Sequence, residues 1–210
     1  MQSSLTVVVS AQSESLVSLY EAKLALNLQD SVLATTDDQI EMLIEWSSAE
    51  IAALCNRVFA RETVIEKFTT VDTFHNRVYL SRYPVTEISV MIEDGSPLVR
   101  DTDYDLDSSS GLITRTGSAW CMPLSVTYTG GYDLPNAAPR ALRQAALLMT
   151  REAYNAISRG DASIRMVSHK DSRVIYFDPN AKSGAAGASS GSPARRAIGD
   201  LLTHFTRFWV

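Results

Sequence analysis

Two long segments of the chain repeat their inward-facing residues with the period of an amphipathic helix. The first covers residues 36–59, and Asp37 and Asp38 lie in its first turn, where the helix dipole favours negative charge. The second opens on Pro139 and ends before Gly160, which are residues typical of helix starts and ends. The predicted stripes are Ile40, Leu43, Ile44, Ser47, Ile51, Leu54, Cys55 and Val58 in the first helix, and Leu142, Ala145, Ala146, Met149, Ala153 and Ile157 in the second. We predict that the two helices pack against each other.

Two shorter helices are expected near the ends of the sequence. Residues 13–27 carry leucines at roughly helical spacing, with Ser13 as the predicted N-cap. Residues 194–210 regain helical spacing after residues 180–193, a segment rich in Gly, Ala and Ser that is typical of a flexible linker.

Between the two long helices the apolar period changes from helical to alternating, which indicates strands. We expect strands within residues 63–68, 77–80, 86–92, 104–106, 111–116 and 124–129. Asp94 and Gly95 follow one of these strands and predict a hairpin turn. A further strand or hairpin arm is expected at residues 173–177. Short successive strands joined by tight turns favour antiparallel pairing.

These elements predict an α+β fold, in which a helical core carries an inserted antiparallel β meander and a tethered C-terminal helix. We expect one domain over residues 1–179, a linker over residues 180–193 and a docking helix over residues 194–210.

Composition and charge narrow the classes of protein. The 210 residues are 45% hydrophobic and 20% charged, which is typical of a folded globular protein. The net charge of -5 disfavours a protein whose main role is to bind DNA or RNA phosphates. The longest apolar runs are far shorter than the ~20 residues that cross a bilayer, so we expect no membrane partner. Two cysteines cannot form a disulfide framework, and the start of the chain lacks the charged and apolar parts of a secretory signal, so a cytosolic product is expected.

The motifs of reactive sites are missing or incomplete. Asp101, Asp103, Asp105 and Asp107 resemble the start of a calcium loop, but the required Gly and the terminal Glu are absent, so an exposed strand is the favoured interpretation. Asp72 and His75 form a local acid and base pair that we interpret as a polar turn. We therefore predict no catalytic, metal or cofactor site.

Two features point to a partner instead. The C-terminal helix carries Leu201, Leu202, Phe205, Arg207, Phe208 and Trp209, which either fold back on the protein's own core or form a docking patch for a neighbouring molecule. A small basic cluster of Arg165, His169, Lys170 and Arg173 is most often a solvated surface, and otherwise a contact for acidic partners or phosphates.

The order of these features is similar to that of the head-tail connector (adaptor) proteins of tailed bacteriophages. The matching residues are the helix from Asp37, Tyr83-Pro84-Val85 before the strand at 88–92, Asp103 to Leu106 with Gly111 to Ile113, Val126 to Tyr132, and the Pro139 helix to Tyr154. The resemblance covers roughly residues 16–160 and, more weakly, Leu201 to Arg207. Residues 161–193 depart from it, because they are longer and richer in Gly, Ala and Ser than in that family.

The resemblance implies a structural virion protein and not an enzyme. Made in the cytoplasm of a bacterial host, it would form a homo-oligomeric ring of about a dozen copies at the head-tail junction. The ring would bind the portal protein and the next neck or tail-completion protein, and would extend the DNA channel with only transient, non-specific contact to the genome. Two alternatives are an oligomeric α+β enzyme with a site at subunit boundaries, and a DNA-binding packaging component that uses the basic cluster.

Overall fold

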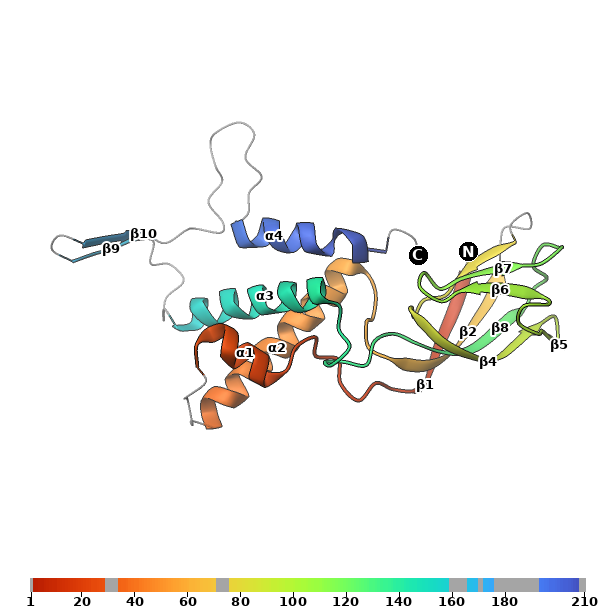
Figure 1. Ribbon diagram of the computed structural model, residues 1–210, viewed down its shortest axis with the longest axis horizontal. Coiled ribbons are helices and arrows are strands. Elements are labelled where there is room, and N and C mark those ends of the chain that lie inside the picture. The colour runs from red at the N-terminus through yellow and green to blue at the C-terminus, as the bar shows by residue number, and fades with distance from the viewer. Residues whose placement is uncertain are drawn as a thin grey trace, which may run out of the picture. The chain divides into compact units, whose positions relative to one another are not determined.

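A computed structural model describes residues 2–28, 34–70, 76–158, 166–169, 172–175 and 193–207. The chain divides into two compact units (Figure 1). The β unit consists of Met1–Glu14, Asn56–Ala138 and Arg207–Val210, and the helical unit consists of Ser15–Cys55 and Pro139–Thr206. The predicted α+β class is confirmed, because the antiparallel β segment is inserted between the two long helices. Residues 180–192 of the predicted linker lie outside the described residues.

The β unit contains two antiparallel sheets. The larger has the order β1-β2-β8-β4-β5, and the smaller has the order β3-β7-β6. The strands of the larger sheet are β1 (Gln2–Val9), β2 (Glu62–Thr70), β4 (Val85–Glu93), β5 (Ser96–Pro97) and β8 (Leu124–Gly130). Those of the smaller sheet are β3 (Arg77–Tyr79), β6 (Tyr104–Asp107) and β7 (Leu112–Arg115). The sequence analysis predicted every strand of this unit except β1 and the two-residue β5.

One apolar core joins the two sheets. Strand β8 shows the physical basis, because every second residue from Leu124 to Gly130 is buried and the residues between them are half-buried. The core also takes residues from both sheets, including Val64, Phe68, Val78, Met91, Leu106, Ile113 and Tyr128. Burial of this set, at about 25 cal/mol per Å² of apolar surface, provides the main stabilisation of the unit.

Turn residues set the ends of the strands. The predicted hairpin between β4 and β5 is confirmed, since Asp94 and Gly95 have positive φ angles of 44° and 79°. At the end of β8, Gly130 lies against the backbone of Arg82, where a Cβ atom would be 2.2 Å from the carbonyl oxygen. Only glycine allows this close approach, which brings the 81–84 segment onto the sheet.

The helical unit contains α1 (Leu19–Leu26), α2 (Ala34–Cys55), α3 (Arg140–Ser158) and α4 (Pro193–Leu202), followed by the 3-10 turn η1 (Thr203–Phe205). Helix α3 packs against α1, α2 and α4. The predicted packing of the two long helices is thus confirmed. A buried hydrogen bond from Thr150 Oγ1 to Ser47 Oγ, 3.1 Å long, links α3 to α2.

Several details of the helix predictions were wrong. The helix predicted over residues 36–59 ends at Cys55, so Val58 lies outside it. The first helix is capped by Ser18 and not by Ser13, because Ser18 and Glu21 form a reciprocal capping box. Leu54 and Ile157, which we placed on the buried stripes, are 55% and 53% exposed. Each lies near the C-terminal end of its helix, where it has turned away from the packed stripe.

A third sheet, of two strands, follows α3 in the chain. It pairs β9 (Met166–His169) with β10 (Ser172–Ile175) in antiparallel register. The expected strand at 173–177 is therefore confirmed over residues 173–175, while residues 176 and 177 lie outside the described part of the chain.

Candidate partner-binding surface

A groove of about 720 Å³ runs along the helical unit. Helix α2 contributes Trp46, Glu50 and Leu54 to its lining, while α3 and α4 contribute Met149, Glu152, Ala153, Ala156, Arg195, Ile198, Gly199 and Leu202. Trp46 is 60% exposed, although burial of the large apolar ring of a tryptophan would be favourable. Trp46, Met149 and Arg195 of the lining belong to residue types that are enriched at protein interfaces, which makes the groove a candidate binding surface.

Helix α4 folds back on its own chain and forms one wall of this groove. Ile198 and Leu202 are each 4% exposed, while Leu201 is half-buried. The sequence left open whether the C-terminal helix folds back on its own protein or docks on a neighbour. The burial of Ile198 and Leu202 shows that α4 folds back. Leu202 serves the packing of the helical unit and is not an exposed docking contact.

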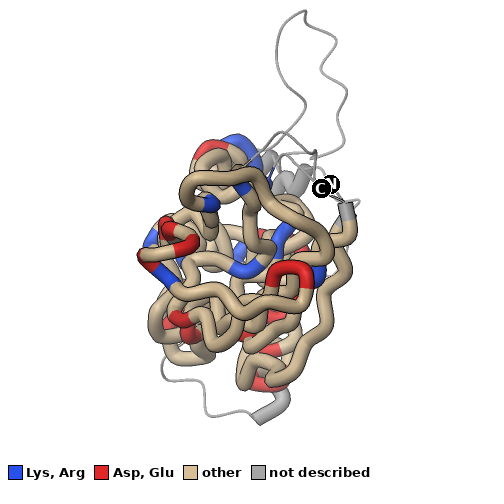
Figure 2. The backbone as a smooth tube through the Cα atoms, turned by 90° about the vertical axis from the view of Figure 1, so that its right-hand side faces the viewer, with Lys and Arg blue, Asp and Glu red and all other residues tan. Residues whose placement is uncertain are grey.

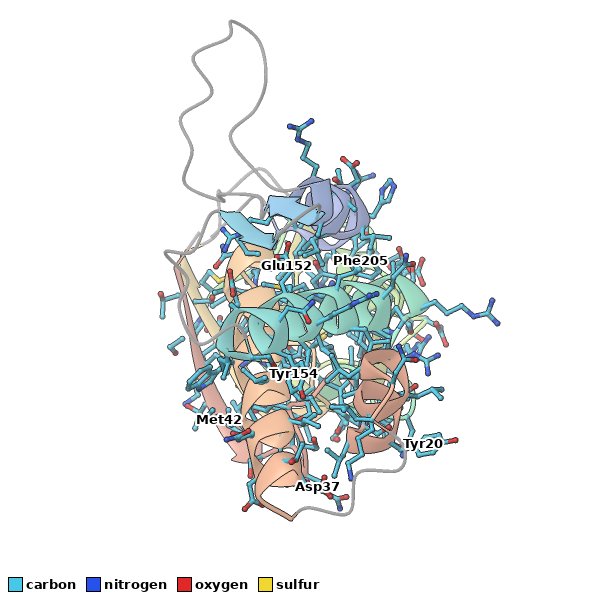
Figure 3. The ribbon with its side chains drawn as sticks, turned by 90° about the vertical axis from the view of Figure 1, so that its left-hand side faces the viewer. Tyr20, Asp37, Met42, Glu152, Tyr154 and Phe205 are labelled. Carbon is cyan, nitrogen blue, oxygen red and sulfur yellow. The ribbon has the colours of Figure 1, made fainter. Side chains whose placement is uncertain are left out.

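The helix predicted over residues 194–210 is shorter than expected: α4 ends at Leu202, η1 ends at Phe205, and Thr206 is extended. The rest of the predicted docking patch lies beyond α4. Phe205 and Arg207 are half-buried, and Phe208 and Trp209 lie outside the described residues. Figure 3 shows Phe205 near the end of α4, on the side of the helical unit where Glu152 also lies. The docking role of these residues stays a prediction.

The predicted basic cluster is only partly described. His169 ends β9 and Arg173 lies in β10, where Arg173 is paired with Ser168. Arg165 and Lys170 lie outside the described residues, as does the predicted acid and base pair of Asp72 and His75. The hairpin thus places the backbones of His169 and Arg173 close together, on neighbouring strands.

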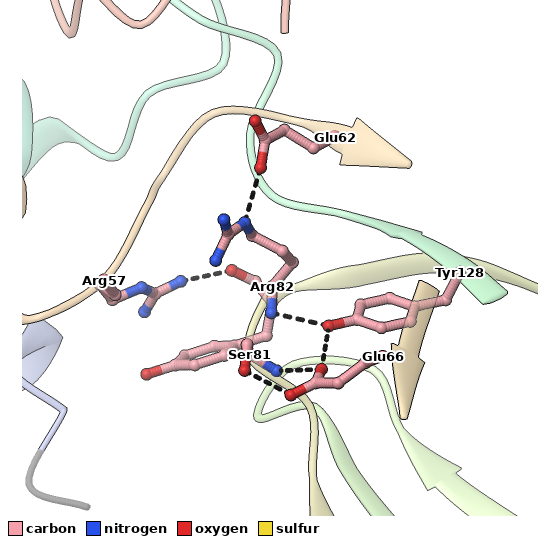
Figure 4. Close-up of polar contacts among 7 residues, drawn as sticks. Arg57, Glu62, Glu66, Ser81, Arg82 and Tyr128 are labelled. Carbon is pink, nitrogen blue, oxygen red and sulfur yellow. Dashed lines mark hydrogen bonds and ion pairs between the residues drawn. The ribbon is translucent and has the colours of Figure 1, made fainter. Parts of the chain in front are cut away.

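A buried polar network in the β unit escaped the sequence analysis (Figure 4). The carboxylate of Glu66, which is 0% exposed, accepts hydrogen bonds from the backbone N–H of Ser81 at 3.0 Å, the hydroxyl of Ser81 at 2.5 Å and the hydroxyl of Tyr128 at 2.7 Å. The hydroxyl of Tyr128 in turn accepts from the backbone N–H of Arg82 at 3.0 Å. Three donors of Ser81 and Arg82 therefore hold the start of the 81–84 segment to β2 and β8, and the Tyr128 hydroxyl links these two strands.

Two arginines extend this attachment. Arg82 Nε donates to Glu62 at 2.7 Å, and both side chains are largely buried. Arg57 donates to the carbonyl oxygen of Tyr83, and its guanidinium lies 3.6 Å from the ring centre of Tyr83 and 4.7 Å from that of Phe59. Such planar cation contacts stabilise a loop without a regular ladder of backbone hydrogen bonds.

The surroundings of Tyr128 favour its neutral form. Burial raises the pKa of the Tyr128 phenol, and the neighbouring Glu66 carboxylate raises it further. A phenol that favours its neutral form and a carboxylate that accepts three hydrogen bonds match a structural role. The sequence does carry a signal for this network. Side chains alternate between the two faces of a strand, so Glu62 and Glu66 of β2 lie on the same face as the buried Val64 and Phe68, and two acids therefore belong to the core face.

The aspartates that resemble a calcium loop are occupied with local contacts. Asp103 accepts from the backbone N–H of Val99 at 2.8 Å, and Asp105 accepts from that of Leu106 at 2.9 Å. Hydrogen bonds from the side chains of Ser109 and Ser110 lower the pKa of Asp107 to about 2. Within the described ranges, no group of three or more His, Cys, Asp or Glu side chains is arranged to hold a metal ion.

No helix among the described residues is long and apolar enough to cross a bilayer.

Comparison with known protein families decides what kind of protein this architecture belongs to. Residues 16–158 match the family model described as "Head completion protein". This range holds α1 to α3 and all of the β segment between α2 and α3. The chain belongs to the head completion protein family. Membership confirms the resemblance to head-tail connectors that the order of sequence features indicated.

Solved structures share the fold of this head completion protein at low sequence identity. A chain from the neck of an empty gene transfer agent (GTA) particle, computed with C6 symmetry, matches with a TM-score of 0.60 and 16% identity, over 99% of this chain and 97% of that chain. A chain from the virion of a native GTA particle matches with a TM-score of 0.60 and 16% identity, over 98% and 96% of the two chains. A chain from the neck of a native GTA particle, computed with C12 symmetry, matches with a TM-score of 0.51 and 15% identity, over 99% and 97%. No curated protein matches the sequence.

Proposed function

We propose that this head completion protein is a structural component of the virion neck, where copies form a ring that joins the portal to the next neck or tail protein. The observation that carries the proposal is the family match over residues 16–158, because it includes the helices and the β segment that together make the fold. The similar chains from GTA necks computed with C6 and C12 symmetry support a ring, since cyclic symmetry places identical copies side by side. No catalytic step is part of this role.

The ring would extend the DNA channel without holding the genome tightly. Tight binding to phosphates requires clustered cations that release counterions, and this chain has a net charge of -5. Seen from the side of the β unit, acidic and basic positions are interspersed and form no continuous basic stripe (Figure 2). We expect the purified protein to bind DNA weakly and without sequence preference. A salt-sensitive submicromolar complex would contradict this part of the proposal.

Cryo-electron microscopy of particles from the source virus tests the proposal as a whole. The expected result is density for a closed ring of this chain below the portal, at the vertex where the head meets the tail. Particles that contain the head and the portal but lack this chain at the vertex would refute the proposed function.

The docking segment of the ring is proposed to be the end of the chain, with Phe205, Arg207, Phe208 and Trp209 as contacts to the portal. Deleting residues 207–210 tests this and spares Ile198 and Leu202, whose burial the helical unit needs. We expect a folded protein that no longer attaches to portal-bearing capsids. A matched control is Val99→Ser, which changes a 62% exposed apolar residue of the β unit. Attachment of the shortened chain at the level of this control would overturn the docking role.

A further inference from the structure

Helix α2 carries apolar residues on two faces, and its own unit covers only one of them. The covered face holds Ile40, Leu43, Ile44 and Ile51, all 2% exposed or less. The other face follows a four-residue spacing through Met42, Trp46, Glu50 and Leu54, with exposures of 37%, 60% and 55% for the three apolar members. Exposed apolar residues that gather on one face of a helix mark a candidate interaction surface.

The groove next to this second face has room for a partner helix at close range. Gly199 lies inside α4 and lines the groove, although glycine in a helix interior costs about 1 kcal/mol relative to alanine. A Cβ atom built at Gly199 meets no atom within 4 Å, so packing inside this chain does not explain the glycine. Ala153 and Ala156 of α3 line the same groove with small side chains. Small residues at these three positions of the lining suit the close approach of another backbone.

A second uncovered apolar feature lies on α1 of the same unit. Tyr20 and Leu24 are four residues apart, which places them on one face of the helix, and they are 72% and 49% exposed. We call this pair the α1 ridge. In Figure 3, Tyr20 projects from α1 on the opposite side of the helical unit from Met42. The ridge and the groove are therefore separate surfaces of one copy.

Helix α1, which carries the ridge, is similar in length to the α2 wall of the groove, and the ridge and the groove have complementary chemistry. The eight residues of α1 are about 12 Å long, and the eight-residue separation of Trp46 and Leu54 along α2 is also about 12 Å. The Tyr20 phenol can donate a hydrogen bond, and the exposed Glu50 carboxylate between Trp46 and Leu54 can accept one. Tyrosine and tryptophan are also the side chains that most often anchor protein interfaces.

From these observations we infer that the α1 ridge of one copy binds in the α2–α3–α4 groove of the next copy. This head-to-tail contact uses two different surfaces of each copy, which is the arrangement that closes into a ring and not into a twofold dimer. The inference rests on the proposed function, since it names the contact between neighbouring copies in the neck ring.

Disulfide trapping in assembled particles tests the contact. The background variant is Cys121→Ser, because Cys121 is exposed and Cys55 is 0% exposed. On this background, a chain with both Tyr20→Cys and Leu54→Cys should form, after mild oxidation, a ladder of covalent multimers on non-reducing gels. Neither single variant should form the ladder, because a head-to-tail contact never brings two copies of one surface together.

The control pair is Tyr20→Cys with Val99→Cys, which replaces an equally exposed residue of the β unit. A ladder of equal strength from the control pair would overturn the inference, and so would dimers from Tyr20→Cys alone. The absence of multimers in particles that contain the chain would overturn the inference and leave the proposed function standing. The absence of the chain from the particles would instead refute the proposed function.

A second measurement covers the case in which the double-cysteine chain is not incorporated. The photoreactive p-benzoylphenylalanine at position 20 keeps the size of a tyrosine side chain on an exposed surface. Illumination of particles should join position 20 of one copy to peptides of α2, α3 or α4 of another copy, in a band of twice the chain's mass. Cross-links only to the portal or to another neck protein would overturn the proposed occupant of the groove.

Discussion

The buried hydroxyl of Tyr128 provides the sharpest test of how the β unit is held together. The change is Tyr128→Phe, which keeps the ring in the core and removes only the oxygen. That oxygen donates to the Glu66 carboxylate at 2.7 Å and accepts from the Arg82 backbone N–H at 3.0 Å. The variant therefore loses a bond to a buried acid and leaves a backbone donor without its acceptor.

The expected loss follows from these two contacts. A hydrogen bond to a charged group contributes about 1.5–3 kcal/mol, and an unsatisfied buried donor costs about 1–3 kcal/mol. The two donors of Ser81 still bond to Glu66 and offset part of the combined loss, so we expect the free energy of unfolding to fall by about 3 kcal/mol. Urea denaturation followed by fluorescence and by circular dichroism measures it, and agreement of the two probes checks that unfolding is two-state.

The matched control is Tyr104→Phe. Tyr104 belongs to the same core cluster and is 3% exposed, but its hydroxyl makes no hydrogen bond to the described part of the chain. We expect this variant to lose about 0.5 kcal/mol or less, since neither partner of a buried hydrogen bond is removed. A Tyr128→Phe variant as stable as Tyr104→Phe would show that the Glu66 network contributes nothing net to folding, and would refute the reasoning.

Three further predictions follow from other contacts of the β unit. Burial and, next, the Glu66 charge raise the pKa of Tyr128, so the neutral phenol stabilises the fold fully below pH ~10, where the unfolded phenol ionises, and this stabilisation is lost as the pH rises further. The loss of stability at alkaline pH should therefore be smaller in Tyr128→Phe than in the unchanged protein. Equal losses in the two proteins would contradict this. Hydrogen bonds from Ser109 and Ser110 lower the pKa of Asp107 from 3.8 to about 2, so the Asp107 carboxylate stabilises the fold above pH 3.8 and loses this effect as the pH falls through about 2. In Ser109→Ala, which lacks one of these donors, the pKa of Asp107 measured by NMR titration should rise. Gly130→Ala should lower the free energy of unfolding by about 3 kcal/mol, because the new Cβ would lie 2.2 Å from the Arg82 carbonyl oxygen. Gly117→Ala, with open space around it and a φ of +76°, should lower it by about 1 kcal/mol. Similar losses for the two variants in denaturation experiments would exclude the steric explanation.

One error in the sequence analysis lies where a helix has two apolar faces. The spacing of Ile40, Leu43, Ile44 and Ile51 predicted a helix and its buried stripe. The same spacing wrongly included Leu54, because a wide apolar stripe does not show where the packed face ends: Cys55, the next residue, is 0% exposed, while Leu54 is 55% exposed. The exposed line through Trp46 and Leu54 became visible only when α3 and α4 were in place.

The candidate surfaces were predicted unevenly for a similar reason. The apolar character of the C-terminal helix was evident from its spacing, but its fold-back depends on contacts with α3, which ends 35 positions before α4 begins. The groove, with linings from three helices, has no counterpart in any continuous stretch of sequence.

By itself, the sequence determined the local elements of this protein, because helix and strand periods, caps and turns depend on residues within a few positions of each other. Asp94 and Gly95 required a hairpin, and the alternation in residues 124–130 required a half-buried strand. Only the tertiary structure decided which groups meet across the chain. Glu66 finds its donors 15 and 62 residues away, in Ser81 and Tyr128, and a buried carboxylate is stable only when such distant partners converge on it.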